Sequence, residues 1–179
     1  MRKTNVTGLF IFVLYCIIGL NGYGQTSPED WLSLTEDNYT IRYPAEWTLD
    51  ESQQMGTSFI LFSPLSSAED QFKENVNLIV QDLSAYDMDL DQYVELSEDQ
   101  VKTMIAEANI LASKRVKRDG SEFQKMLYTG TQGAFDLKFE QYYWIKDKKA
   151  YVLTLTTEVD QFDAFQPAGE KILDSFRIE

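Results

Sequence analysis

The chain has 179 residues, a formal net charge of −13, no histidine and a single cysteine, Cys16. Without histidine, neither a Ser–His nor a Cys–His catalytic arrangement can form, and acid–base chemistry would fall to carboxylates, lysine or tyrosine. The negative balance disfavours binding to nucleic acid and to anionic lipid, because both call for basic surfaces.

The first two dozen residues have the pattern of a secretory signal peptide. A positive start at Arg2 and Lys3 precedes an uncharged apolar run over 9–20, and small residues stand before a cut at Gln25. The apolar run of 12 residues falls short of the roughly 20 that a membrane-spanning helix needs. We therefore expect residues 1–24 to be a signal peptide and the product to be exported, either periplasmic or secreted, with no membrane span after the leader is removed.

Removal of this leader leaves residues 25–179, which we expect to form one domain. Because the leader carries two basic residues and no acid, its loss lowers the net charge from −13 to −15 and removes the only cysteine. A disulfide, a Cys/His zinc site and a cysteine nucleophile are then excluded. Lipidation at Cys16 is disfavoured, because the bulky Tyr15 stands where a lipoprotein signal peptidase needs a small residue.

The first predicted unit of the domain is a β-hairpin. Two short alternating runs, 31–35 and 39–43, flank a polar turn. Pro44 cannot donate to a strand ladder, so pairing should end there, and the turn that follows is expected to return Trp47 to the core.

Two more strands are predicted before the pattern changes. Residues 59–62 are continuously apolar, which is typical of a strand covered on both faces. Residues 63–71, with a proline and several serines, read as a loop. Val76, Leu78 and Val80 then alternate with Asn77, Ile79 and Gln81, which indicates a strand.

One long helix is predicted to begin near Leu90. Asp89 fits its N-cap, and Gln92 three residues later completes a capping box. The apolar residues that share its buried stripe are Leu90, Tyr93, Val94, Val101, Met104, Ile105 and Ala108.

Strand spacing returns in the second half of the chain. Runs at 110–118 and 122–131 are joined by Asp119-Gly120, and further runs follow at 135–145 and 151–159. We expect these runs to form an antiparallel meander covered on both faces.

A helix is predicted to close the domain. Pro167 suits the first turn of a helix, and its buried stripe would contain Ile172, Leu173 and Phe176.

Several of these features together resemble the PsbP-like superfamily, in particular its bacterial DcrB-like envelope branch. They are the Tyr-Pro-x-x-Trp pattern of 43–47, the single mid-chain helix near Leu90 and the terminal Ile-Leu-Asp-Ser-Phe of 172–176. The resemblance covers most of the chain after the leader. It implies an α+β fold, an α/β/α sandwich whose central, mainly antiparallel sheet is flanked by helices. It also implies a non-catalytic accessory or binding protein without a cofactor, whose partner is another envelope protein or a small ligand.

An acidic segment offers a weak candidate for a metal site. Asp87, Asp89 and Asp91 alternate, and Glu98 follows at the spacing of a helix-loop-helix calcium loop. However, Gln92 stands where that loop needs glycine, and a loop cannot also form the predicted helix. Capping of the helix and interaction with its dipole are the preferred interpretation.

The only dense basic cluster is a candidate contact for an anion or an acidic partner. It contains Lys114, Arg115, Lys117 and Arg118. The competing interpretation is a strand whose charges protect it against edge-to-edge pairing, and alternation would divide the cluster between two faces. For Tyr142, Tyr143 and Trp144 a ligand groove is possible, but packing beneath a helix is the simpler interpretation.

Three functions follow from this reading. The preferred one is a non-catalytic exported binding or accessory protein. The second is a calcium-responsive module that uses the segment 87–98. The third is a hydrolase that relies on carboxylates alone, which would need two acids facing each other across a cleft.

Overall fold

The computed structural model describes residues 30–118 and 120–179. The predicted leader, its cut before Gln25, Cys16 and Asp119 lie outside these residues. The main element is a seven-stranded sheet in which every strand runs antiparallel to its neighbours. Across this sheet the order is β3 (Thr48–Asp50), β4 (Phe59–Phe62), β5 (Asn75–Asp82), β9 (Lys149–Glu158), β8 (Phe135–Lys146), β7 (Ser121–Gln132) and β6 (Ala106–Arg118).

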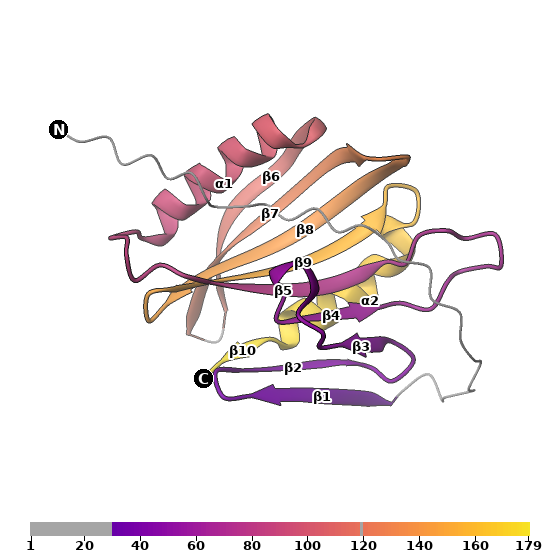
Figure 1. Ribbon diagram of the computed structural model, residues 1–179, viewed down its shortest axis with the longest axis horizontal. Coiled ribbons are helices and arrows are strands. Elements are labelled where there is room, and N and C mark those ends of the chain that lie inside the picture. Colours follow the sequence, from indigo (N-terminus) through magenta and orange to yellow (C-terminus); the bar gives the residue numbers. More distant parts are fainter. Residues whose placement is uncertain (1–29, 119) are drawn as a thin grey trace.

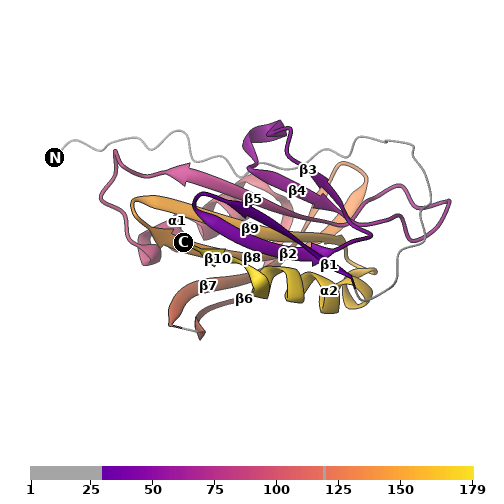
Figure 2. The same cartoon turned by 90° about the horizontal axis from the view of Figure 1, so that it is seen from below.

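Two helices and a smaller sheet complete the fold. Helix α1 (Leu90–Met104) packs on one face of the large sheet, and α2 (Phe162–Ser175) packs on the other (Figures 1 and 2). The smaller sheet has the order β1-β2-β10 and shares the α2 side of the core. Its strands are β1 (Trp31–Glu36), β2 (Tyr39–Pro44) and β10 (Arg177–Ile178), and a 3-10 turn, η1 (Gln54–Gly56), follows β3. The predicted sandwich of a mainly antiparallel sheet between helices is confirmed.

The N-terminal hairpin forms as predicted. Strand β1 pairs with β2 in register from Trp31 opposite Pro44 to Glu36 opposite Tyr39. The strand ends at the proline, and the N–H of Trp47 then donates to the carbonyl of Pro44 at 3.0 Å. This turn places the indole of Trp47 in the core. The sequence did not predict β3, η1 or β10, which are too short to carry a periodic signal.

The four strands of the second half form the predicted meander, β6-β7-β8-β9. Strand β6 lies at the edge of the sheet and has register shifts between Ala106 and Asn109 and between Ile110 and Ala112. Both the basic cluster and these irregularities are typical of edge strands that resist pairing with another chain.

Helix α1 begins as predicted and ends earlier. The Asp89 carboxylate accepts from the Gln92 N–H at 2.9 Å, and the Gln92 side chain accepts from the Asp89 N–H at 3.0 Å. The helix stops at Met104, so the expectation that Ala108 belongs to its stripe is wrong, since Ala108 lies in β6. Met104 is 55% exposed, which contradicts its predicted burial.

The early end of α1 has a packing cause. Ile105 turns into the core beside Gly130, where a Cβ atom would lie 2.3 Å from Ile105 Cγ2. Glycine at this point of β7 therefore lets the chain leave the helix close to the sheet. The residues that follow pair with β7, beginning with Ala106 opposite Thr131.

Helix α2 begins earlier than predicted. It starts at Phe162, so Pro167 lies inside the helix and not in its first turn. Proline there removes one helical hydrogen bond. Burial of Phe162 in the core offsets that loss, because a buried phenylalanine contributes about 2 kcal/mol. Near the middle of the helix, Gly169 allows close approach to Leu155, whose Cδ2 would lie 2.5 Å from a Cβ at this position.

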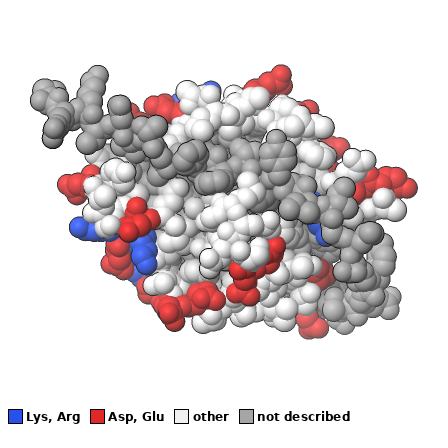
Figure 3. Space-filling model, in the orientation of Figure 1, with Lys and Arg blue, Asp and Glu red and all other residues white. Residues whose placement is uncertain are grey.

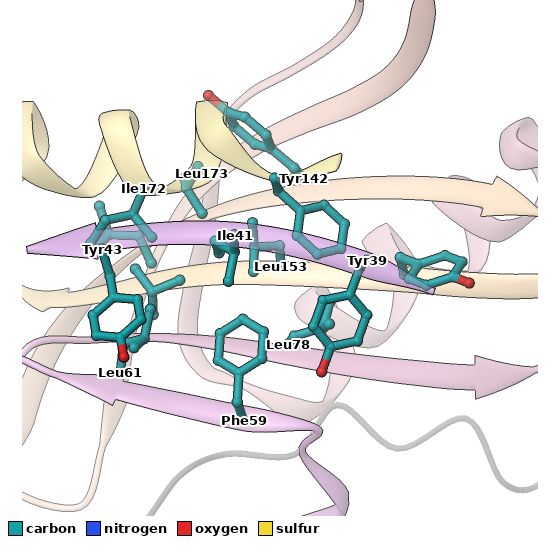
Figure 4. Packing of buried hydrophobic residues seen from close by; sticks show 14 of the residues in the cluster. Tyr39, Ile41, Tyr43, Phe59, Leu61, Leu78, Tyr142, Leu153, Ile172 and Leu173 are labelled. Atoms are coloured by element: carbon teal, nitrogen blue, oxygen red, sulfur yellow. The ribbon is translucent and has the colours of Figure 1, made fainter. Parts of the chain in front are cut away.

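The two faces of the large sheet support two separate clusters of buried residues. The α2-side core is continuous and apolar, and Figure 4 shows side chains of β2, β4, β5, β9 and α2 pointing toward one another. Its members from the large sheet are Phe59, Leu61, Val76, Leu78, Phe123, Tyr142, Trp144, Tyr151, Leu153 and Leu155. The main members of the α1-side core are Tyr93, Val101, Ile105, Met126, Tyr128, Leu137, Phe139, Tyr143 and Val152.

No helix in 30–118 or 120–179 combines the length and apolar character needed to cross a membrane.

Candidate functional site

A cavity of about 250 Å³ lies between α1 and the sheet, and we call it the α1 cavity. Strands β5, β9, β8 and β7 supply its floor, and α1 contributes Tyr93, Ser97, Gln100 and Met104. Among the described residues that line the cavity, none carries a formal charge.

The floor of the cavity is polar because the sheet register aligns polar residues of neighbouring strands. Asn77 of β5 stands opposite Thr154 of β9, which in turn stands opposite Gln141 of β8. One pleat away, Asn75 stands opposite Thr156. Partners across a ladder share a face of the sheet, so amide and hydroxyl groups form a patch in the middle of this face.

Hydrogen bonds within the patch use only part of its capacity. Gln141 donates from Nε2 to Thr154 Oγ1 at 3.0 Å and accepts from the Tyr143 hydroxyl. Asn77 donates from Nδ2 to Asn75 Oδ1 at 3.4 Å, a long bond. Both asparagines are buried, and a side-chain amide offers two donor hydrogens and two acceptor sites. Asn77 therefore retains most of its hydrogen-bonding capacity toward the cavity.

Aromatic residues stand beside this polar patch. The ring of Tyr128 stacks on that of Phe139 with centroids 4.7 Å apart, and Tyr93 lies 6.0 Å from Tyr143. Burial raises the pKa of Tyr93, Tyr128 and Tyr143 above the ordinary value of a phenol. These hydroxyls consequently remain neutral and can both donate and accept hydrogen bonds.

The helix contributes polar groups and an exposed rim. The Ser97 hydroxyl donates to the Tyr93 carbonyl at 2.8 Å, and the Tyr93 hydroxyl donates to Gln81 Oε1 at 2.6 Å. The second bond ties α1 to β5 across the cavity. Met104, at the end of the helix, is the exposed apolar member of the lining.

The structure does not bring the four acidic candidates together. Asp89 is occupied as the N-cap, and Asp91 pairs with Arg115. Glu98 lies on α1, 3.8 Å from Lys102. Across 30–118 and 120–179 there is no group of three or more Cys, Asp or Glu residues placed to hold a metal ion.

The basic cluster is paired within the chain at three of its four positions. Arg115 contacts Asp91 and Glu122, Lys117 lies 2.8 Å from Glu122, and Arg118 contacts Asp174. Lys114 lies in the same edge strand, opposite Lys125 of β7. Acidic side chains predominate on the described part of the face seen in Figure 3.

The three consecutive aromatics divide between the two sides of β8. Tyr143 lines the α1 cavity, whereas Tyr142 and Trp144 belong to the α2-side core. Those two also line a more open hollow of about 450 Å³ near β10, together with Arg118 and Lys146. Because Arg118 contacts Asp174 and Lys146 donates to the Ile178 carbonyl at 3.2 Å, this hollow is a weaker candidate for a ligand site.

Sequence reasoning missed the residues of the polar patch, although a signal was present. The pattern Asn-Val-Asn of 75–77 and the pattern Thr-Leu-Thr of 154–156 place polar groups at alternate positions of strands that are covered on both faces. Polar side chains in such strands need partners. The same alternation of buried polar residues in two strands indicates a buried polar site. Only the pairing of β5 with β9 shows that the polar residues of the two strands lie side by side.

A family model described as PsbP matches residues 29–178. Among solved structures, the chain is similar to cyanobacterial PsbP (CyanoP) from Synechocystis sp. PCC 6803, with a TM-score of 0.65 and 16% identity over 89% of this chain and 99% of that one. It is also similar to PA94 of Pseudomonas aeruginosa, described as a protein of unknown function and putative regulator (TM-score 0.59, 14% identity, 81% and 94% covered). A third similar structure is that of LpqN, described as involved in cell envelope biogenesis of Mycobacterium tuberculosis, with a TM-score of 0.56 and 10% identity over 83% of this chain and 90% of that one. A comparison with curated proteins found no match.

Proposed function

Since this chain belongs to the PsbP family, as its sequence predicted, we propose that it is an exported, non-catalytic accessory protein that binds a small ligand in the α1 cavity. The observation that carries the proposal is the buried amide of Asn77, which makes one hydrogen bond of 3.4 Å and is 8% exposed. No atom of Asn77 is among the fully buried, unpartnered side-chain atoms of the described chain, so its remaining capacity opens into the cavity. A ligand that displaces solvent from the cavity must replace those hydrogen bonds or lose about 1–3 kcal/mol, which favours a ligand with polar groups at this point.

Export is supported by the signal-peptide pattern of residues 1–24 and by the envelope role in the description of LpqN. A non-catalytic role is supported by the chemistry of the lining. The chain has no histidine, and the described lining of the cavity has no carboxylate, lysine or arginine. A carboxylate-only hydrolase would need acids at this site, and a calcium-responsive module would need Asp89 free of its capping bond.

The test uses the full-length gene expressed in a bacterial host and the product purified from the cell envelope. Intact mass spectrometry reports processing, with a cut before Gln25 as the expected result. A library of small neutral, anionic, cationic and apolar compounds is then screened by ¹H–¹⁵N chemical-shift mapping. We expect at least one compound to shift the amides of β5, β9 and α1 while its own spectrum remains that of unconverted compound.

Thr156→Val and Thr157→Val form a matched pair of variants. The two threonines are adjacent in β9 and both buried, but only Thr156 lines the cavity. Thr156→Val should weaken binding, and Thr157→Val should not. Binding that maps elsewhere, a loss of affinity common to both variants, or conversion of the compound would contradict the proposal.

A further inference from the structure

We infer that the ligand of the α1 cavity is an uncharged, polyhydroxylated compound the size of a single sugar ring. This inference rests on the proposed function and adds the chemical class of the ligand. It follows from four properties of the cavity: its lack of charge, its unused hydrogen-bonding capacity, its aromatic residues and its volume.

The uncharged lining excludes an ionic ligand. An ion that leaves water for a buried site must be paired or strongly hydrogen-bonded, and no described lining residue can supply an opposite charge. At the end of the cavity that Met104 and Ile105 line, an anion would also meet the C-terminus of α1, where the helix dipole is negative.

The polar floor excludes a wholly apolar ligand. An acyl chain in the cavity would leave Asn77 and Thr156 without partners, at a cost of about 1–3 kcal/mol for each buried group. Within the described chain, the Thr156 hydroxyl makes no hydrogen bond. A hydroxyl group of the ligand would satisfy both residues, because it donates one hydrogen bond and accepts others.

The remaining properties favour a ring with a polar edge and an apolar face. Phe72, Tyr128 and Phe139 provide apolar aromatic surface next to Asn75 and Thr156. The C–H face of a sugar ring packs against such a surface while its hydroxyls reach amide groups. A cavity of about 250 Å³ has the volume of about eight water molecules at ~30 Å³ each, which suits one sugar ring or a compound of similar size.

The test compares neutral compounds with charged forms of the same ring. The probes are D-glucose, D-galactose, D-mannose and myo-inositol, each as a neutral compound, set against glucose 6-phosphate, glucuronate and glucosamine. Cyclohexylmethanol serves as a largely apolar ring of similar size. Binding to the envelope-purified protein is measured by chemical-shift mapping and calorimetry.

We expect at least one neutral probe to bind in the cavity and to bind more tightly than its charged derivatives. Thr156→Val and Asn77→Leu should each weaken it about five- to tenfold, which is the loss of roughly one hydrogen bond. Thr157→Val should change the affinity by less than about twofold by the same reasoning, because its hydroxyl lies on the other face of the sheet. The amide spectrum of each variant shows whether it is folded.

The outcomes separate the inference from the proposed function. If only charged probes, or only cyclohexylmethanol, bind in the cavity, the ligand class is wrong and the binding function stands. If neither these probes nor the wider library bind in the cavity, both are wrong. Equal loss of affinity in Thr156→Val and Thr157→Val would mean that the effect is structural and would also overturn the assignment.

Discussion

The two faces of the seven-stranded sheet are built from the same strands and differ in how they are filled. On the α2 side, Leu78 and Leu153 are fully buried among aromatic and aliphatic neighbours (Figure 4), and so is Leu155. On the α1 side, Asn77 and Thr154 stand one residue along the same strands, and a cavity remains beneath the helix. The α2 face thus has the composition of a stabilising core, whereas the α1 face gives up apolar contact for hydrogen-bonding groups.

The α2 face contains a buried carboxylate, that of Glu140, and the way it is paired sharpens this difference. Glu140 is 1% exposed and pairs with Lys125 at 2.6 Å, and Lys125 also lies 2.8 Å from Glu170 of α2. Burial raises the pKa of Glu140, and the nearby ammonium opposes that rise. A charge is therefore tolerated on this face because it is paired and because the pair also joins the sheet to the helix.

The largest expected effect comes from breaking this pair with Lys125→Met. The variant leaves the Glu140 carboxylate buried without a cation, and we expect the free energy of unfolding to fall by about 3–5 kcal/mol at pH 8. The loss should be smaller at pH 5, because a carboxyl whose pKa is raised on folding is stabilising when protonated and loses that contribution as the pH rises.

Urea denaturation of Lys125→Met at the two pH values measures this effect. The double variant Lys125→Met with Glu140→Gln is the control and should recover most of the stability. A loss that is independent of pH and is not recovered by the double variant would show that packing of the lysine stem, and not the buried charge, is responsible.

The next effect compares neighbouring residues of β9 on the two faces. Leu153→Ala removes a fully buried side chain from the α2-side core and should lower the free energy of unfolding by about 2–5 kcal/mol. Thr154→Val keeps the shape of a residue that lines the cavity but removes the acceptor of the Gln141 Nε2 hydrogen bond, so it should lower the free energy of unfolding by only about 1 kcal/mol. Chemical denaturation of both variants tests the comparison, and similar losses would show that the α1 face is packed as tightly as the other.

The smallest of the three expected effects concerns Glu74, which directly precedes β5. Glu74 is fully buried, accepts a long bond of 3.4 Å from the Ser63 hydroxyl and has an Oε1 atom without a partner in the described chain. Burial raises its pKa to about 7, and the carboxylates of Asp70 and Glu158 add to the rise. Its contribution to stability is therefore present below its unfolded pKa of 4.5 and is lost as the pH rises through 7.

Glu74→Gln replaces this carboxyl by a neutral group of the same shape. Relative to the wild type, the variant should gain about 2 kcal/mol of stability between pH 5 and pH 8, since one pKa unit corresponds to 1.36 kcal/mol. Thermal unfolding of both proteins across this range is the measurement. Parallel stability curves would mean that Glu74 is ionised in the folded protein throughout.

Local sequence rules predicted most of the elements but failed where packing overrode them. The capping residues Asp89 and Gln92 defined the start of α1, because a cap depends only on neighbours along the chain. The end of α1 was misplaced, because it depends on Gly130, a residue of a strand that packs against it. Pro167 was assigned to the start of α2 for the same reason, since nothing local indicates that Phe162 enters the core.

The basic cluster and the acidic segment show the same division. Their charges are visible in the sequence, but their partners come from elsewhere in the fold, as with Arg118 and Asp174. Charge density therefore suggested an anion contact and acidic spacing a calcium loop, whereas the structure uses most of these charges in ion pairs and in the helix cap.

By itself, the sequence determined the family, the antiparallel meander, the capped helix and the two-sided covering of the sheet. These depend on periodicity and turn chemistry, which act over a few residues. Only the tertiary structure decided that Asn77, Thr154 and Gln141 meet across three strands and that α1 leaves space above them. Strand order and register bring distant residues together, and the volume beneath a helix depends on every side chain that holds it in place.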